Sequence, residues 1–504
     1  MPGRFPLTPV ALTDDAFCEE AYCGDRIRLI RKCWYRRGSN ATPRSKVYGC
    51  AADPNGDMYV ADYFGSGVLP AIYKISNDVT QVWGKVYSLD PALVSTALNA
   101  YGNSYFVLNA GSTYIDFLAW QWSPAGPPYG VDHPIRIYRH RVRKADGSIV
   151  SVAAVDFNPV GNPNELYIDI RDVKIDANNN YYFIGSLPIN SETATTCVFK
   201  FTENLTFVWC KGIRQTVYRG GCGVSLRDGN LFASLTIGDN GLIGCAGISN
   251  FVHVAPSYFS LDFNGNTLSS FLPKFSTPDI SNDLTPFIPL SVCRDAQGNI
   301  YGFGGYEAPA LGIYYPVVVY KDSPSDTTIW AKNIRNTFYS GGGYLIGKGN
   351  QLLVVSGKLV LAAPWRLGDT YRLFICVFNT TTGAIERSLD FRVPSTCGEG
   401  AIIQALPEPG KFIVQTDFGY RIRLDVNDLP ADGSYPCTDG PTPYTVSSAS
   451  TASVNHTFYR FTTCGSSSPA LLSRDLSGMF TTVTPVSTIA AATHGVFNNF
   501  ACQD

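Results

Sequence analysis

The sequence has few charged residues. Asp, Glu, Lys and Arg make up 16% of its 504 residues, against roughly 25% in typical soluble proteins. The formal net charge is -2 and there is no long basic run, so no nucleic-acid partner is predicted. The densest basic stretch, residues 26–37, is interpreted as a solvated face. No apolar run reaches the roughly 18 residues that a bilayer-spanning helix needs, which excludes a helical membrane span.

Catalytic motifs are also missing. The chain has 5 histidines, and none stands in a metalloprotease motif or a metal-ligand cluster. There is no nucleophile elbow, P-loop or paired-cysteine redox motif. No catalytic residue is therefore assigned, and the sequence favours a protein that is not an enzyme.

Turn-forming and aromatic residues are abundant: the chain has 47 Gly, 32 Pro, 29 Tyr and 29 Phe. Helices exposed on a protein surface need Glu, Lys and Ala, whereas aromatic residues suit strands and Gly and Pro suit turns. This composition predicts an all-β protein made of many short strands.

One phrase recurs along the chain, a turn containing Asn or Gly followed by an aromatic strand. Its clearest copy runs from Asp53 to Val60. Successive copies are roughly 45 to 75 residues apart, which suits four strands plus loops. The pattern predicts that each turn opens an inner hairpin. The seven copies begin at Asp53, Ala100, Asp176, Arg227, Asp295, Lys348 and Glu408.

A second phrase follows most copies, an outer strand and then, in three of them, Trp-x-Lys. The three tryptophans are Trp83, Trp209 and Trp330. The segments 209–221 and 330–342 share eight of thirteen residues, among them an Arg, a Tyr and a Gly-Gly pair. These arginines and tyrosines are interpreted as lining a channel or capping the joint between blades, with a structural role favoured over binding.

Together these phrases predict a seven-bladed β-propeller over residues 46–430. The pattern Asp-x-x-Gly-Asn-x-Tyr, then a Phe/Val-x-Lys strand, then Trp resembles the β-propeller repeats of bacterial surface and secreted proteins, and more loosely the NHL repeats. The resemblance implies a fold but no activity, because propellers carry unrelated functions. The quinone-dependent dehydrogenase propellers fit less well, since their Thr-Gly pair occurs once, at Thr382-Gly383, without the Trp.

The first 45 residues are predicted to be an N-terminal extension that supplies a strand closing the ring against the last blade. Cys18, Cys23, Cys33 and Cys50 lie in or beside it. Their spacing fits no common zinc motif, so disulfides or buried thiols are favoured over zinc. The aspartates that open the turns are interpreted as turn caps, with Ca²⁺ binding as the alternative. No cofactor is predicted.

The largest insertion, residues 109–168, combines aromatic and cationic side chains, as saccharide- and protein-binding surfaces do. The alternative is that it forms the outer half of blade two, with its tryptophans packed. The candidate binding residues here and at the two repeated junctions are Trp120, Trp122, Tyr129, Arg139, Arg141, Arg214, Tyr218, Arg335 and Tyr339.

Residues 431–504 are rich in Ser and Thr and are predicted to form a small β module, with a Cys464–Cys502 disulfide as its staple. The run from Tyr459 to Cys502 resembles small terminal modules of viral tail and surface proteins.

The 14 cysteines favour an oxidising environment, while no signal peptide is found at residues 1–6. A virion or extracellular location reconciles the two. The sequence therefore predicts an oligomeric binding or assembly protein, such as a phage tail component, that mediates adhesion through other surface proteins, a host receptor or a glycan. The alternative is a propeller hydrolase or lyase acting on a saccharide or lactone at the channel mouth.

Overall fold

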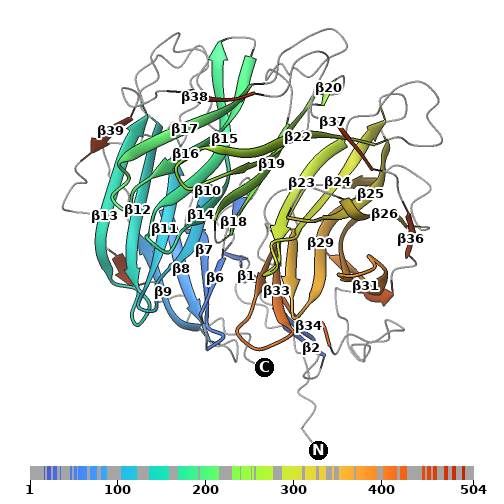
Figure 1. Ribbon diagram of the computed structural model, residues 1–504. Coiled ribbons are helices and arrows are strands. Elements are labelled where there is room, and N and C mark those ends of the chain that lie inside the picture. Colours follow the sequence, from blue (N-terminus) through green and yellow to red (C-terminus); the bar gives the residue numbers. More distant parts are fainter. Residues whose placement is uncertain are drawn as a thin grey trace, which may run out of the picture.

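The computed structural model describes the chain, with short gaps, over residues 50–87, 104–121, 135–157, 169–214, 230–275, 287–336 and 343–427. It also describes the backbone of short strands within 16–47 and 445–493. Seven antiparallel sheets stand in a ring, and the predicted seven-bladed β-propeller is confirmed (Figure 1). No helix of the described residues is long and apolar enough to cross a membrane.

Each blade runs outward from the axis in strand order. Blade 1 holds β6 (Cys50–Ala52), β7 (Met58–Phe64), β8 (Leu69–Ile75) and β9 (Gln81–Tyr87). Blade 2 holds β10 (Ser104–Ala110), β11 (Tyr114–Gln121), β12 (Ile135–Arg143) and β13 (Ile149–Phe157). Blade 3 holds β14 (Asp169–Ile175), β15 (Tyr181–Asn190), β16 (Thr193–Phe201) and β17 (Phe207–Arg214).

Blade 4 holds β18 (Asn230–Gly238), β19 (Gly241–Asn250), β21 (Ser257–Leu261) and β22 (Thr267–Phe275), with β20 (His253–Val254) beside β19. Blade 5 holds β23 (Phe287–Arg294), β24 (Ile300–Ala308), β25 (Ile313–Asp322) and β26 (Thr328–Asn336). In blade 6, β27 (Gly343–Leu345) and β28 (Leu352–Val355) both pair with β29 (Lys358–Leu367), followed by β30 (Thr370–Asn379) and β31 (Ile385–Val393).

Blade 7 combines the two ends of the propeller. β32 (Ala401–Ala405), β33 (Lys411–Thr416) and β34 (Arg421–Asp425) come from the C-terminal side, and β3 (Ile27–Ile30) pairs antiparallel with β34. β2 (Glu20–Cys23) adds a fifth strand outside β3. The N-terminal segment therefore supplies the predicted closing strand, and a second strand besides.

Two further pairings involve the N-terminal segment. β1 (Ala16–Phe17) pairs with β4 (Trp34–Tyr35). β5 (Lys46–Val47) runs parallel to β10, the innermost strand of blade 2, and pairs with it. Because β11 occupies the outer edge of β10, β5 lies on the edge that faces the axis.

The C-terminal strands do not form a sheet of their own among the described residues. Each pairs with the fourth strand of a different blade, and successive strands visit the blades in descending order (Figure 1). We call these six strands the C-terminal belt. They are β35 (Thr445–Ser448) on blade 6, β36 (Thr451–Asn455) on blade 5, β37 (Phe458–Phe461) on blade 4, β38 (Ala470–Arg474) on blade 3, β39 (Phe480–Val483) on blade 2 and β40 (Ala491–Thr493) on blade 1.

This arrangement differs from the predicted β module, and edge chemistry explains it. The fourth strand of a blade presents unpaired N–H and C=O groups, which a further strand satisfies. With β2 on blade 7, every blade gains a fifth strand.

A β-bulge stands in the fourth strand of blades 1–6, just before the belt pairing. In blade 1, Lys74 pairs with Trp83 and Ile75 with Gln81, so Val82 is the extra residue. A bulge leaves its extra residue unpaired and bends the strand. The belt pairings stop two to four residues from the bulge. The other extra residues are Val150, Val208, Leu268, Ile329 and Glu386.

Three looser copies of the repeat precede the first strand of their blade and do not form the turn of its inner hairpin, contrary to the prediction. Those beginning at Ala100, Arg227 and Lys348 lead into the innermost strands β10, β18 and β28. The inner hairpins of these blades close through shorter turns, such as Ser356-Gly357, where both φ angles are positive. A two-residue turn of this kind closes the hairpin without the longer phrase that begins with Asp. Each blade still contributes one copy, so the count of seven holds.

The hydrophobic core lies between neighbouring blades. Separate clusters fill the interfaces of blades 1 and 2, 2 and 3, 3 and 4, and 5 and 6. In blades 2 and 3, clusters therefore cover both faces of the inner strands.

Candidate functional site

The two ends of the ring differ. At one end, short turns join the first strand to the second and the third to the fourth, and we call this the turn end. At the other, the connection end, longer segments join the strands, among them residues 88–103, 122–134, 158–168, 215–229 and 276–286. Loops on a rigid scaffold are where propellers and similar folds place binding groups.

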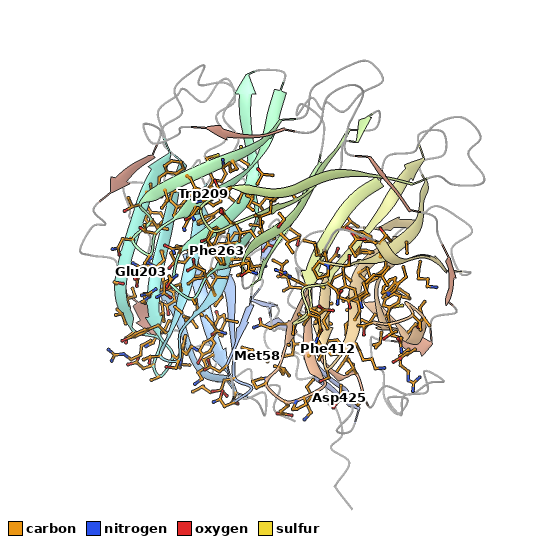
Figure 2. All side chains as sticks on the ribbon, in the orientation of Figure 1. Met58, Glu203, Trp209, Phe263, Phe412 and Asp425 are labelled. Carbon is orange, nitrogen blue, oxygen red and sulfur yellow. The ribbon has the colours of Figure 1, made fainter. Side chains whose placement is uncertain are left out.

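At the turn end, each Trp-x-Lys motif joins its blade to the next one. The Nε1 of Trp83 in blade 1 donates to the backbone oxygen of Lys144 in blade 2, at 3.0 Å. Trp209 donates to the backbone oxygen of Phe263 at 3.3 Å; both residues are labelled in Figure 2. Trp330 donates to the backbone oxygen of Thr380 at 3.1 Å, again across one interface. The motif therefore occurs at alternate interfaces, those of blades 1 and 2, 3 and 4, and 5 and 6.

Each of these tryptophans packs on a glycine of the neighbouring turn. Gly147, Gly265 and Gly383 have φ angles of +71°, +82° and +70°. A Cβ on Gly147 would lie 2.8 Å from Trp83 Cε3, and one on Gly383 would lie 2.8 Å from Trp330 Cδ2. Both the backbone conformation and the contact with Trp require glycine there.

The opening aspartates serve the turns. Both carboxylate oxygens of Asp176 accept hydrogen bonds, from the backbone of Asn178 and Asn180, the amide of Asn180 and the Tyr182 hydroxyl. Asp295 makes the same set of contacts with Gln297, Asn299 and Tyr301. Burial, and then the hydrogen bond to the carboxylate, raises the pKa of both tyrosines, which stay neutral donors.

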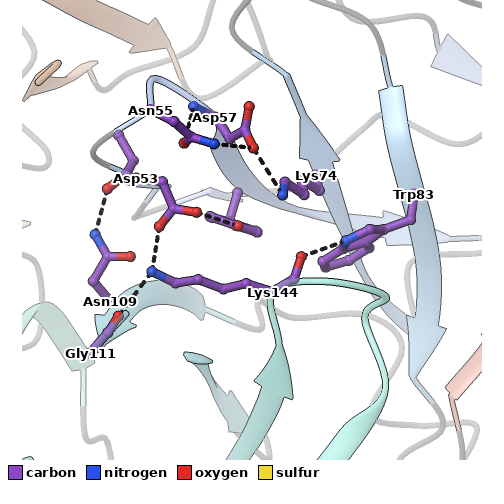
Figure 3. Close-up of polar contacts among 10 residues, drawn as sticks. Asp53, Asn55, Asp57, Lys74, Trp83, Asn109, Gly111 and Lys144 are labelled. Carbon is purple, nitrogen blue, oxygen red and sulfur yellow. Dashed lines mark hydrogen bonds and ion pairs between the residues drawn. The ribbon is translucent and has the colours of Figure 1, made fainter. Parts of the chain in front are cut away.

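The interface of blades 1 and 2 is a charged version of this arrangement (Figure 3). Lys144 Nζ contacts Asp53 and the backbone oxygen of Gly111, at 2.9 Å for the latter. Asp57 stands where the other turns have Asn180 and Asn299, and it pairs with Lys74 Nζ at 2.9 Å. The extra carboxylate of this interface is thus matched by an extra cation, Lys144.

A buried ion pair within blade 2 contacts blade 3 through Tyr181 and Glu203. Arg141 donates to both oxygens of Asp116, at 2.8 and 2.7 Å, and also contacts Glu203. The hydroxyl of Tyr181, from blade 3, donates to Asp116 at 2.5 Å. Asp116 is fully buried. Arg141 therefore has a complete set of protein partners.

His140 lies beside this pair, at the interface of blades 1 and 2. It is fully buried against the rings of Tyr87, Phe117 and Tyr138, with centroids 5.9 to 6.2 Å away. Neither ring nitrogen has a hydrogen-bond partner. Burial, and then the charge of Arg139, lowers the pKa of His140 to about 3.

Because His140 is buried in its neutral form, we expect the folded chain to become less stable in acid. Between pH 6.5 and 3 the unfolded chain binds a proton that the folded chain does not, so the free energy of unfolding falls as pH falls, by up to about 1.4 kcal/mol per pH unit. From pH 6.5 to 4.5 we expect the native chain to lose about 2–3 kcal/mol more than His140→Leu, measured by urea unfolding. Equal losses in the two chains would contradict this role of His140.

The predicted binding residues divide between the two ends. Trp120, Arg214 and Arg335 are at or next to the last residues of β11, β17 and β26, where these strands reach the connection end. Arg139 is 2% exposed and Arg141 is 9% exposed. Burial between blades corrects the expectation that these two arginines stand on an exposed surface. Trp122, Tyr129, Tyr218 and Tyr339 lie outside the described residues.

Within the predicted insertion, residues 109–121 and 135–157 belong to β10–β13 of blade 2. Residues 122–134 and 158–168 lie outside the described residues. The polar groups that hold the interfaces were not singled out from the sequence, except for the opening aspartates. One feature of the sequence could have pointed to Asp116: it is an acidic residue between two apolar residues, Ile115 and Phe117.

Four of the described cysteines have placed side chains, and all four are buried thiols. Cys197, Cys210, Cys293 and Cys376 are buried in the core. Burial raises the pKa of the Cys293 and Cys376 thiols, which keeps them protonated and unreactive. The proposed Cys464–Cys502 pair lies outside the described residues. Among described residues no cluster of His, Cys, Asp or Glu could hold a metal ion.

The chain has a weak likeness to several solved structures. No family model and no curated protein matches the chain. Among solved structures, a PL25 ulvan lyase bound to a saccharide is similar, with 11% identity and a TM-score of 0.42, covering 77% of this chain and 96% of its own. The arabinofuranosidase Arb93A of Fusarium graminearum has 11% identity and a TM-score of 0.37, covering 68% and 98%.

The neuraminidase-like N11 protein of a flat-faced bat influenza virus has 9% identity and a TM-score of 0.32, covering 75% of this chain and 94% of its own. At such identities the likeness concerns the fold alone.

Proposed function

We propose that this protein is a non-enzymatic attachment scaffold that binds a saccharide at the connection end of its propeller, as a component of a virion or of an extracellular surface. The observation that carries the proposal is the difference between the two ends. At the turn end, tyrosine hydroxyls donate to carboxylates of the same blade. Two further contacts, Lys144 with Asp53 and Tyr181 with Asp116, cross a blade interface. These contacts stabilise the fold and do not form a catalytic site.

The connection end has the residue types that bind saccharides. Trp120 is the next-to-last residue of β11, and Arg214 and Arg335 are at equivalent places at the ends of β17 in blade 3 and β26 in blade 5. Aromatic faces and guanidinium groups suit sugar rings that bear carboxylates or sulfates. β5 occupies the axis-facing edge of blade 2, where an enzyme would gather catalytic groups from several blades.

A panel of neutral, uronic acid and sulfated polysaccharides tests the proposal, with binding and product release measured on the same samples. We expect binding of an acidic polysaccharide without cleavage, weakened about tenfold or more in Arg214→Ala plus Arg335→Ala. Such a loss equals about 1.4 kcal/mol. Arg143→Ala, an exposed arginine at the turn end, is the matched control and should bind like the native chain.

Two results would overturn the proposal. Binding to no polysaccharide would remove the saccharide as partner. Catalytic release of products would favour the alternative, a propeller hydrolase or lyase. The ulvan lyase and the arabinofuranosidase are named for activities of these classes.

A further inference from the structure

The contact between Lys144 of blade 2 and Asp53 of blade 1 lies inside the protein (Figure 3). The two side chains are 8% and 12% exposed, and the residues are 91 positions apart in the chain. Tyr59 and Trp83 pack beside them, with ring centroids 6.1 Å apart. The amine therefore touches an oxygen bonded to the carboxyl carbon, at a site from which side chains exclude most water.

Asp53 differs from the aspartates that open the turns of blades 3 and 5. Each of those accepts hydrogen bonds from two backbone N–H groups of its own turn. In blade 1 the backbone N–H of Asp57 donates instead to the side-chain oxygen of Asn55, at 3.2 Å. The two oxygens of Asp53 contact Lys144 Nζ and the Tyr59 hydroxyl, the latter at 2.6 Å. The Asp53 carboxyl is therefore directed at Lys144 rather than used as a turn cap.

The fold alone does not account for Lys144. Its backbone oxygen accepts the hydrogen bond from the Trp of blade 1, and Phe263 and Thr380 have this role at the other two Trp interfaces. Neither of these two side chains is a cation. Those interfaces therefore keep the same Trp contact without a lysine at this position.

The surroundings of Lys144 Nζ match an amide better than an ammonium group. An ammonium has three N–H donors. Lys144 Nζ contacts Asp53 and the backbone oxygen of Gly111, and it lies over the Tyr59 ring, 5.7 Å from the centroid. An amide at this place has one N–H, for which Gly111 is the acceptor, and one oxygen, to which Tyr59 donates. Its formation also removes two charges whose burial costs free energy.

From this arrangement we propose that Lys144 and Asp53 condense to an amide, which joins blades 1 and 2 covalently. A desolvated lysine amine is a nucleophile. A bond forms between Nζ of Lys144 and Cγ of Asp53, and the bond from Cγ to Oδ1 breaks. Oδ1 leaves as water with two of the three ammonium protons, and the third proton stays on the amide nitrogen.

The Tyr59 hydroxyl assists this step. It donates to Oδ2 of Asp53, the oxygen on which negative charge develops as the nitrogen attacks. The step needs no co-reactant, because an ammonium and a carboxylate together contain all the atoms of an amide and a water.

The mass of the intact chain tests the proposal, independently of saccharide binding at the connection end. The full chain is reduced and denatured before its mass is measured. We expect a mass lower than that of the sequence by one water molecule, and a digest in which a peptide containing Asp53 is joined to one containing Lys144. The full mass of the sequence without a joined peptide would show an ion pair only and would overturn the proposal.

Three variants locate the bond. Lys144→Arg keeps the positive charge but lacks the amine, so it should have the full mass of its sequence, and Asp53→Ala is a second such variant should the first fail to fold. The matched control is Lys74→Arg, because Lys74 pairs with Asp57 in the same cluster at 2.9 Å, with side chains 14% and 12% exposed. The control should still lack one water. If the loss of water persists in Lys144→Arg or Asp53→Ala, or disappears in Lys74→Arg alone, the bond lies elsewhere and the proposal is overturned.

Discussion

Replacing Asp116 by Ala is expected to lower the free energy of unfolding by about 3–5 kcal/mol, because it leaves the buried guanidinium of Arg141 without its two-pronged partner. The hydroxyl of Tyr181 loses its acceptor at the same time. The double variant Asp116→Leu plus Arg141→Met removes both charges and is expected to recover most of this loss. Denaturant unfolding of the three chains measures the effect.

A matched control comes from a more exposed pair. Lys358 and Glu386 lie 2.7 Å apart with side chains 32% and 29% exposed. Glu386→Gln should therefore cost about 1 kcal/mol or less. The assignment of Asp116 as a tie between blades 2 and 3 would be contradicted by a loss as small as this control, or by a double variant no more stable than the single one.

Gly147→Ala is expected to destabilise the chain by about 2–5 kcal/mol, through two separable effects. A positive φ costs a non-glycine residue about 1–2 kcal/mol. The new Cβ would also meet Trp83 and Lys85 at 2.7 to 2.9 Å, and overpacking of this kind costs about 1–3 kcal/mol. Thermal or denaturant unfolding measures the sum.

Gly111→Ala isolates the backbone effect. Gly111 has a φ of +75°, but a Cβ there would meet nothing within 4 Å. It should lose only the about 1–2 kcal/mol of the backbone term. If the two variants were equally stable, the packing of Trp83 on the turn of blade 2 would not be what holds this interface.

The ring itself could be predicted from sequence because its signals are local. An Asn/Gly turn, an aromatic strand and a Trp-x-Lys motif each lie within a few residues of one another. The alternation of interfaces could not be seen, because the partner of Trp83 is a glycine in the next blade. A single sequence does not show that these two residues are in contact.

The belt was not predicted, for a different reason. A sheet edge pairs with an added strand through backbone hydrogen bonds. The strands β35 to β40 therefore need no side-chain pattern that is specific for the blade with which each pairs. Ser- and Thr-rich strands separated by turns resemble a small module equally well. Arg139 and Arg141 were placed on a surface because cations next to aromatic residues usually lie there. In a propeller, a neighbouring blade covers each face of the strand, and the arginines become buried ties.

The turn end is expected to hold the ring together and the connection end to bind the partner. Unfolding and affinity for the acidic polysaccharide, measured on the same samples of Asp116→Ala and Arg335→Ala, separate the two roles. We expect Asp116→Ala to lose stability and keep its affinity, and Arg335→Ala to keep its stability and lose affinity. Loss of both properties in both variants, or the reverse assignment, would contradict this expectation.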